Sequence, residues 1–490
     1  MCKKRRDGVI TPLAAISLLL VLSLILTLLE GARFNYTKEI CDQQVVYAAH
    51  CFLGQYDTEL YEQYGIFGTD IRLFEEKEKI FENMAGFLSP NLGISFLNPE
   101  NYAIKDFKYR LLTDEGGADF RKQAVTSYLY SLPGDILEQL KSRYTYALEV
   151  GTDEDEKKII EDAEKALKEA EKINKNNKDK EADISTLNLQ NSMEKHKASV
   201  NVAKKKSEKE DLIGDYKEKR NSFALSQVLP QGFTVSSATR TIEQRIEERM
   251  LNVGTMEVEA SEGLDEKLLF PMYLTTNYTH ALSSSVEHSK EDELKYQLEY
   301  IVVGKSSDRA NLEGVVKRLV IFRQMVWFAY RLSDSVSRQQ AEAIASVIMG
   351  GLGLPMLIEP VALLILLAWS YDDAVGDVRE LMKGNKVAML PSKAKVDNSK
   401  EMNASYSLGY QEYLFLLIAL EKQQKVTYRA LDVIEEKLSV GDRTFSADCV
   451  ITAIKGSMTY QYDAVFGGQI GHLKTEAFIY SHSSCFEERY

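Results

Sequence analysis

The sequence feature that most constrains the fold is an uncharged apolar run near the amino terminus, Val9–Leu29. At a helical rise of about 1.5 Å per residue, this run spans roughly 30 Å, the thickness of the hydrocarbon core of a bilayer. Pro12 falls in the first turn of the helix, where the missing N–H of proline costs little. The run therefore predicts a transmembrane helix. Its anchoring residues include Val9, Pro12, Leu18, Leu22 and Leu29.

The charges on either side of the run predict its orientation. Four cations precede it, and the pair Glu30 and Arg33 follows it. Cytoplasmic flanks carry an excess of Lys and Arg, so residues 1–8 are expected to form a cytoplasmic basic tail. The rest of the chain is then expected outside the cell, attached to the cell membrane by one pass. The four cations that determine this topology are Lys3, Lys4, Arg5 and Arg6.

Two other interpretations of the run are disfavoured. A cleaved secretory signal has a shorter apolar region and a small-x-small cleavage site. Here Gly31-Ala32 is the small pair, and Glu30 occupies the position where a small residue is required. A buried core helix is unfavourable so close behind four cations. The pattern predicts a retained signal-anchor over residues 9–29.

The helix is expected to continue beyond the membrane as a rod. Residues 32–53 contain no Gly or Pro, and Gly54 is expected to end the helix. Apolar residues recur at helical spacing along this segment and predict one buried stripe. The stripe consists of Ile40, Val45, Ala48, Ala49 and Phe52.

The remaining chain predicts an α+β fold class, mainly helical with small β elements. Residues 30–151 are assigned to the rod and the first part of an extracytoplasmic domain. Residues 152–222 are rich in charge and predict a helical or disordered insertion. Residues 223–490 form the second part, with a helical core over 311–440. A C-terminal hairpin is expected over 444–466, turning at Lys455-Gly456-Ser457.

A second apolar run, Val361–Tyr371, competes with the first as a membrane segment. Its eleven residues are too few to cross a bilayer, so it is predicted to be the central core helix of the outer domain. Three carboxylates follow it: Asp372, Asp373 and Asp377. Such a cluster can serve acid/base chemistry or bind a cation. A solvated helix face explains it more simply.

Sequence motifs for catalysis are absent. There is no Walker-type phosphate loop, no Gly-x-Gly-x-x-Gly, no Gly-x-Ser-x-Gly and no His-Glu-x-x-His. We therefore predict no catalytic, cofactor-binding or metal-binding residues, and expect a protein that is not an enzyme. The net charge of −13 argues against nucleic acid as a partner. The pairing of Cys41, Cys51, Cys449 and Cys485 stays open, with free thiols favoured.

The start of the chain resembles a known family. Gly8-Val9-Ile10-Thr11-Pro12 opens the apolar helix, and Glu30-Gly31-Ala32-Arg33 follows it. These segments resemble the TadE/TadG-like proteins of tight-adherence (Tad) pilus systems. Segments 53–67, 303–308, 328–330 and 367–371 resemble an uncharacterised Firmicutes family, and the similarity extends over most of the chain.

The resemblance implies a membrane-anchored, non-enzymatic accessory or minor pseudopilin-like component of a Tad-type pilus or secretion apparatus. Its partners would be the lipid bilayer and other Tad-type components, with oligomers formed through the N-terminal helix. Prepilin processing usually follows a Gly, here Gly8, and requires Glu at the fifth mature position, where this chain has Leu13. Two alternatives stay open: a membrane-tethered extracellular enzyme or ligand-binding receptor, and a structural cell-wall spacer.

Overall fold

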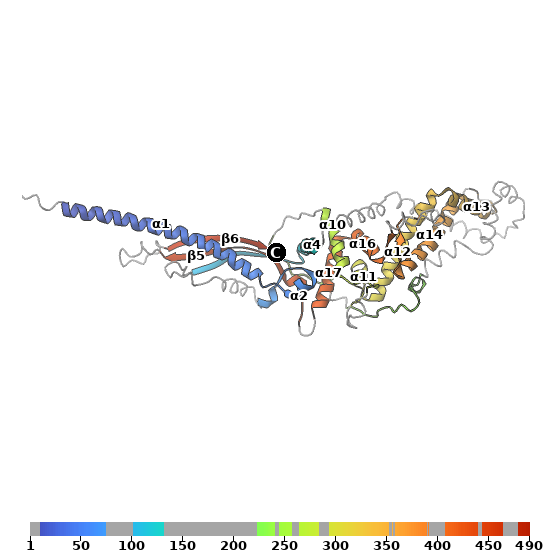
Figure 1. Cartoon of the computed structure of the whole chain (residues 1–490), viewed down its shortest axis with the longest axis horizontal. Coiled ribbons are helices and arrows are strands. Elements are labelled where there is room, and N and C mark those ends of the chain that lie inside the picture. Colours follow the sequence, from blue (N-terminus) through green and yellow to red (C-terminus); the bar gives the residue numbers. More distant parts are fainter. Residues whose placement is uncertain are drawn as a thin grey trace, which may run out of the picture. The chain divides into compact units, whose positions relative to one another are not determined.

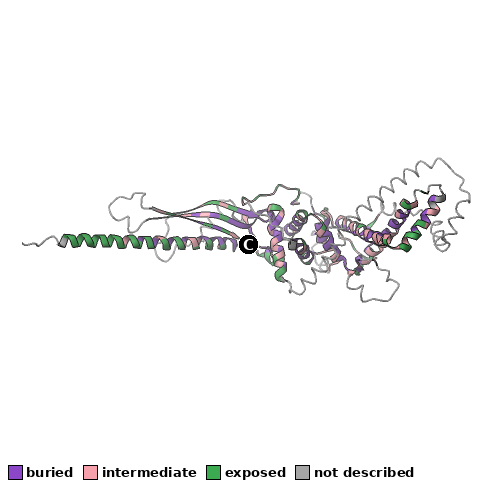
Figure 2. Cartoon of the chain, turned by 90° about the horizontal axis from the view of Figure 1, so that it is seen from above, coloured by how far each residue is buried: buried purple, intermediate pink, exposed green. Residues whose placement is uncertain are grey.

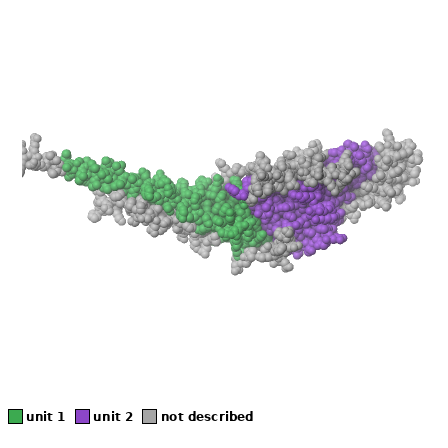
Figure 3. Space-filling view, in the orientation of Figure 1, with its two compact units in different colours: residues 1–127, 249–263, 434–490 green, residues 128–248, 264–433 purple. Residues whose placement is uncertain are grey.

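The computed structural model describes residues 10–74, 101–131, 223–240, 245–256, 264–283, 294–351, 355, 358–389, 391, 407–439, 443–463 and 479–490. Two compact units divide the chain (Figure 3). Unit 1 comprises residues 1–127, 249–263 and 434–490, and unit 2 comprises residues 128–248 and 264–433. Each unit is therefore assembled from segments that lie far apart in the sequence.

Unit 1 is organised by one long helix, α1 (Ile10–Leu53). Its first half, up to Leu29, exposes its side chains, whereas its second half carries a buried stripe (Figure 2). The predicted stripe is confirmed at Val45, Ala48, Ala49 and Phe52, and Ile40 is half-buried. The helix ends at the expected place, because Gly54 follows Leu53 directly.

The stripe packs on an antiparallel sheet formed by β1 (Thr69–Asp70), β2 (Asn101–Leu111), β5 (Val450–Asp463) and β6 (Ile479–Arg489). Strand β5 is central, with β2 on one side and β6 on the other, and β5 and β6 run beside α1 (Figure 1). One face of the sheet joins the core of α1 through Ile454, Met458, Tyr460 and Phe486. The opposite face is polar, with Lys455 paired to Glu487 across the strands.

The C-terminal hairpin expected over 444–466 is wrong. Strand β5 runs without interruption from Val450 to Asp463, straight through Lys455-Gly456-Ser457. Gly456 faces Phe486 of β6, and a Cβ at this glycine would lie 2.9 Å from the Phe486 ring. The glycine marks the close approach of an aromatic ring within a strand, and not a turn.

Four further elements complete the described part of unit 1, and the last turn of one of them, α4, belongs to unit 2. Helix α2 (Thr58–Tyr64) has Asp57 as its N-cap and Gly65 in the left-handed conformation as its C-cap. A 3₁₀ turn follows β1 at Ile71–Phe74, and another precedes β5 at Ala447–Cys449. Helix α4 (Asp114–Ser131) begins with a left-handed kink at residues 115–117.

Unit 2 is mainly helical. Helix α12 (Asp308–Ser333) packs on α14 (Ile358–Met382), and α13 (Ser335–Gly351) packs on the same α14 (Figure 1). Further helices are α10 (Leu264–Asn277), α11 (Gln297–Val303), α16 (Tyr410–Leu420) and α17 (Gln423–Leu438), whose last turns belong to unit 1. A 3₁₀ turn (Leu225–Gln227) and a small ribbon of β3 (Val387–Ala388) and β4 (Ser407–Leu408) complete it.

The run Val361–Tyr371 is confirmed as a core helix. It forms the first half of α14, and most of its side chains are buried, among them Val361, Leu364, Ile365 and Leu366. The chain as a whole is mainly helical, with small sheets and one long apolar helix near the amino terminus. The predicted insertion at 152–222 lies outside the described residues, so it stays a prediction.

Candidate functional site

The first half of α1 exposes apolar side chains on all its sides. Leu18 is 71% exposed, and Leu19 and Leu20, each about a third of a turn further on, are both 67% exposed. The two hydroxyls with described partners bond back into the helix: Ser17 Oγ to the Ala14 carbonyl (2.9 Å) and Thr27 Oγ1 to the Ser23 carbonyl (2.8 Å). This half therefore satisfies its polar groups internally, as a helix in hydrocarbon must.

Among the described residues, α1 is the one helix long and apolar enough to cross a membrane. Such a helix is typical of a membrane anchor or a signal sequence. The predicted anchoring residues Pro12, Leu18, Leu22 and Leu29 are all exposed on it. Val9, Gly8 and the four cations at positions 3–6 lie outside the described residues.

An ion pair within the helix separates the two halves of α1. Arg33 Nη1 lies 2.8 Å from Glu30 Oε1, and both side chains are buried. One turn later, Thr37 donates a hydrogen bond to the Arg33 carbonyl at 2.8 Å. The first polar residues after the apolar run are therefore already paired with each other within the helix.

Beyond this pair, a polar seam fixes α1 to the sheet. Asp42 accepts hydrogen bonds from His482 Nε2 (2.8 Å) and from the Ser484 hydroxyl. Burial by itself would raise the pKa of Asp42, but these two hydrogen bonds and the nearby positive charges lower it. The Tyr460 hydroxyl donates to the Cys41 carbonyl at 3.3 Å, and the Tyr490 hydroxyl donates to the Leu53 carbonyl.

Asp42, His482 and Ser484 are the residue types of a hydrolytic triad, but their geometry differs from one. In a triad the carboxylate and the hydroxyl contact opposite nitrogens of the imidazole. Here Ser484 Oγ lies 3.3 Å from the same Nε2 that contacts Asp42. The three side chains act as a structural clamp between α1 and β6.

The three carboxylates after the α14 apolar run do not form one cluster. Asp377 points into the core of unit 2. Its carboxylate accepts hydrogen bonds from Arg323 Nε (3.0 Å) and Nη2 (2.6 Å) and from Trp327 Nε1 (2.6 Å). Asp373 forms an ion pair with Arg331, and Asp372 is exposed. The three carboxylates therefore differ in their surroundings: Asp372 is exposed, whereas Asp377 pairs with a buried arginine.

Sequence reasoning missed Arg323, the anchor of this arrangement. Its side chain is 1% exposed, and it also donates to the Met389 carbonyl (2.7 Å) and to the Tyr413 hydroxyl (3.0 Å). A signal was present, because the arginine lies on the apolar face of the predicted helix, four residues after the buried Leu319. A cation on such a face indicates a buried carboxylate partner elsewhere in the chain.

A shallow cavity of about 230 Å³ opens beside the end of the α14 apolar run. Helices α12, α13 and α14 each contribute to its wall. Its lining consists of Arg331, Gln340, Trp369, Asp372 and Asp373.

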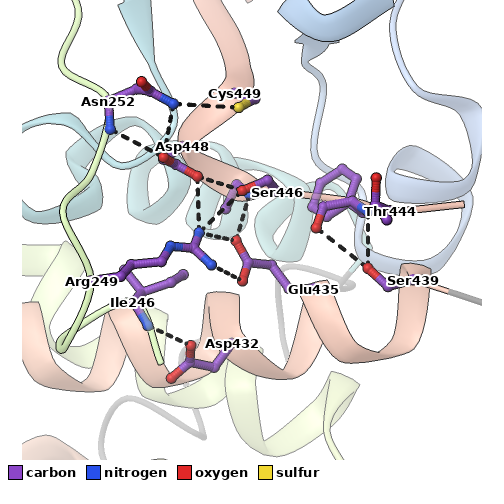
Figure 4. A network of polar contacts seen from close by, with 12 residues as sticks. Ile246, Arg249, Asn252, Asp432, Glu435, Ser439, Thr444, Ser446, Asp448 and Cys449 are labelled. Carbon is purple, nitrogen blue, oxygen red and sulfur yellow. Dashed lines mark hydrogen bonds and ion pairs between the residues drawn. The ribbon is translucent and has the colours of Figure 1, made fainter. Parts of the chain in front are cut away.

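Unit 1 contains a second arginine–carboxylate network (Figure 4). Arg249 pairs with Glu435 (2.6 Å) and with Asp448 (2.9 Å). Asp448 also accepts from the Asn252 backbone N–H (3.1 Å) and from Ser446 Oγ (2.5 Å). Burial opposes ionisation of Asp448, yet these donors and the Arg249 charge hold its pKa below the usual value. The network holds residues 249–252 against the start of β5.

Glu299 of α11 is a fully buried carboxylate in unit 2. Its Oε1 accepts from the Ala281 backbone N–H (2.9 Å) and from the Tyr410 hydroxyl (2.7 Å). Among the described residues, its buried Oε2 has no hydrogen-bond partner. Burial raises the pKa of Glu299 to about 7, since both of these hydrogen bonds only partly offset desolvation.

The four cysteines among the described residues, Cys41, Cys51, Cys449 and Cys485, are free thiols. Cys41 and Cys449 are buried, whereas Cys485 is exposed on β6. Burial raises the pKa of the Cys41 thiol to about 12, so it is an inert part of the core. Among the described residues, no three His, Cys, Asp or Glu side chains gather as metal ligands would.

Comparison with known proteins adds one finding. Residues 202–462 match the model of a family of unknown function (DUF5702). The chain belongs to this family. The DUF5702 match includes α10 to α17 and nearly all of β5, but neither α1 nor β6. No curated protein and no solved structure matches the chain.

Proposed function

We propose that this DUF5702 protein is a single-pass, membrane-anchored component of a Tad-type pilus or secretion apparatus, non-enzymatic and accessory or minor in role. Its amino terminus would lie in the cytoplasm and both compact units outside. The observation that carries the proposal is the continuity of α1, which runs as one helix from an exposed apolar half into a half docked on an antiparallel sheet.

The exposed half supports a lipid environment over a single protein partner. Exposed side chains at Leu18, Leu19 and Leu20 point in three directions around the helix, whereas a protein partner would need one apolar face. Exposing apolar surface to water costs a free energy of roughly 25 cal/mol per Å². A bilayer removes this cost over the whole circumference of the helix.

The docked half supports a pilin-like role. In pilin-like proteins the amino-terminal helix anchors the subunit in the membrane and, in true pilins, later packs in the filament core. Here the carboxyl half of α1 packs on β5 and β6 through an apolar stripe and is fixed by the Asp42 seam. Leu13 replaces the Glu expected after processing at Gly8, which favours a permanently anchored component over a filament subunit.

The test compares intact masses of the protein from washed membranes and from sheared surface filaments. We expect the unprocessed chain in membranes and none in filaments. In parallel, protease added to intact protoplasts should digest both units. Recovery of the protein in the cytosol, or protection of the units until lysis, contradicts the membrane topology. A processed chain in filaments contradicts the accessory role and makes the protein a pilus subunit.

A further inference from the structure

The cavity on unit 2 has the composition of a binding site that the proposed function does not use. Its wall combines a guanidinium, a carboxamide, an indole and two carboxylates, contributed by three helices packed on one another. At about 230 Å³ it lies below the range of drug-sized pockets, so it has room for one small ring. Because it rests on packed helices, its geometry is held by the core of unit 2.

Arg331 is the most constrained group in the wall. Its guanidinium carbon lies 5.6 Å from the Trp369 ring centroid and 5.9 Å from that of Trp327. Its ion pair with Asp373 fixes Nη2. Among the described residues, this is the only hydrogen bond that the guanidinium makes, and its buried Nε has none. The guanidinium of Arg331 is therefore fixed in position, and N–H donors of its Nη groups remain for a ligand.

The mixed charge of the wall disfavours ionic ligands. A cation attracted by Asp372 would lie close to the fixed charge of Arg331, and an anion attracted by Arg331 would meet two carboxylates. A hydroxyl group has no such conflict, since it donates to a carboxylate and accepts from a guanidinium. Gln340 offers both a donor and an acceptor in the same wall.

We propose that this cavity binds one ring of a neutral saccharide. Hydroxyls on neighbouring ring carbons bridge Asp372, Gln340 and the donors of Arg331. The apolar C–H face of the ring lies against Trp369, whose indole supplies the apolar part of the wall. The site is independent of the membrane anchor, and it is a binding site without a reaction.

The test uses saturation-transfer-difference NMR on the full chain in phosphatidylcholine nanodiscs, which avoids detergents with sugar headgroups. The probes are glucose, galactose, mannose and N-acetylglucosamine, each also as its methyl glycoside. We expect a saturable signal from at least one of them. Asp372→Asn and Gln340→Ala should each weaken that binding about tenfold, because the first replaces a charged acceptor with a weaker neutral one and the second removes the carboxamide.

Matched variants separate binding from folding. Asp372 is exposed, so Asp372→Asn should leave the thermal midpoint of the protein unchanged. Glu380→Gln removes a carboxylate from the same helix outside the cavity, and it should leave binding unchanged. Trp369→Phe keeps an aromatic ring but removes part of the platform, and it should reduce the signal from the C–H protons.

Three outcomes would overturn the proposal. They are the absence of a saturable signal from every sugar, a signal that Asp372→Asn and Gln340→Ala leave unchanged, and displacement of the sugar by methylamine or inorganic phosphate at equal concentration. Two further outcomes distinguish the source of the ligand. Binding of a methyl glycoside indicates the terminal residue of a glycan, whereas binding of reducing sugars alone indicates a free monosaccharide.

Discussion

The two most apolar runs of the chain have opposite surroundings. Leu13–Leu29 in α1 is exposed at every position but Leu26, which is half-buried, whereas Val361–Tyr371 in α14 is almost entirely buried. Both runs are helical, and both end in charged residues. They differ in how those charged residues are satisfied.

At the end of the α1 run, Glu30 pairs with Arg33 of the same helix, one turn away. At the end of the α14 run, Asp373 and Asp377 pair with Arg331 and Arg323 of another helix, α12. The ion pair after the α1 run therefore lies within one helix, while the ion pairs after the α14 run join two helices. An apolar helix whose flanking charges pair within the helix can enter a bilayer. An apolar helix whose flanking charges pair with another helix belongs to a globular core.

The largest expected difference comes from placing one charge in each run. Ile365→Arg inserts an unpaired cation at a side chain that is 1% exposed, and it should destabilise unit 2 by more than about 4 kcal/mol. Leu22→Arg at the exposed α1 position should leave the unfolding of both units unchanged, while costing membrane insertion about 3 kcal/mol. Thermal unfolding in nanodiscs reports the first effect, and carbonate extraction of membranes reports the second.

Destabilisation of the folded units by Leu22→Arg would show that a protein surface covers α1. The comparison would then fail. Unchanged unfolding of Ile365→Arg would show that the α14 run is not a core helix.

A somewhat smaller effect concerns the polar end of the α14 run. Asp377→Ala leaves the buried Arg323 charge without its carboxylate and should cost about 3–5 kcal/mol of unfolding free energy. Combining it with Arg323→Met should recover much of that loss, because no charge is then left buried. Chemical denaturation measures both variants.

The matched control on the same helix is Asp373→Ala. Its ion pair with Arg331 is partly exposed on both sides, so its loss should cost less than about 1 kcal/mol. Equal costs at Asp373 and Asp377 would contradict the distinction between a buried and a surface pair.

The third prediction concerns pH. The pKa of buried Glu299 is raised from 4.5 to about 7, so the folded state holds this proton more tightly than the unfolded chain does. Its contribution to stability is fully present below pH 4.5 and is lost as the pH rises through 7. Between pH 4.5 and pH 7, the free energy of unfolding of the wild type should fall by on the order of 3 kcal/mol relative to that of Glu299→Gln. The glutamine keeps an acceptor for Ala281 and Tyr410. Urea denaturation at pH 5 and pH 9 measures the difference.

Glu313→Gln on α12 is the control for this pH effect. Glu313 is half-exposed and pairs with Lys317, which lowers its pKa, so its removal should leave the decline above pH 5 in place. A decline that persists in Glu299→Gln would assign the pH dependence to another group.

Local pattern predicted the helices but not their partners. The pattern of apolar residues was sufficient for α1 and for the helical core that contains α12 and α14, and Gly54 was sufficient for the end of α1. The pairing of Arg323 with Asp377 joins residues 54 positions apart, and no local rule reports it. Gly456 was misread as a turn because the ring that requires a glycine there belongs to another strand.

The order in which the strands pair could not be predicted from the sequence either. Strand β2 (Asn101–Leu111) pairs with β5 (Val450–Asp463), and all of unit 2 is encoded between them. The alternation of residues predicts a strand without saying which strand lies next to it. The long apolar helix α1 could be predicted because its length and composition are local properties of the sequence.

This topology has a consequence for the biogenesis of the protein. Val450, where β5 begins, follows Leu53 by 397 positions, so the docking stripe of α1 leaves the ribosome long before the strands that cover it. At about 5–20 residues per second, that interval lasts roughly 20–80 s. During this interval, Val45, Ala48 and Phe52 form an uncovered apolar stripe on α1. A chaperone or partner subunit that shields this apolar stripe until translation ends would determine the yield of the folded protein.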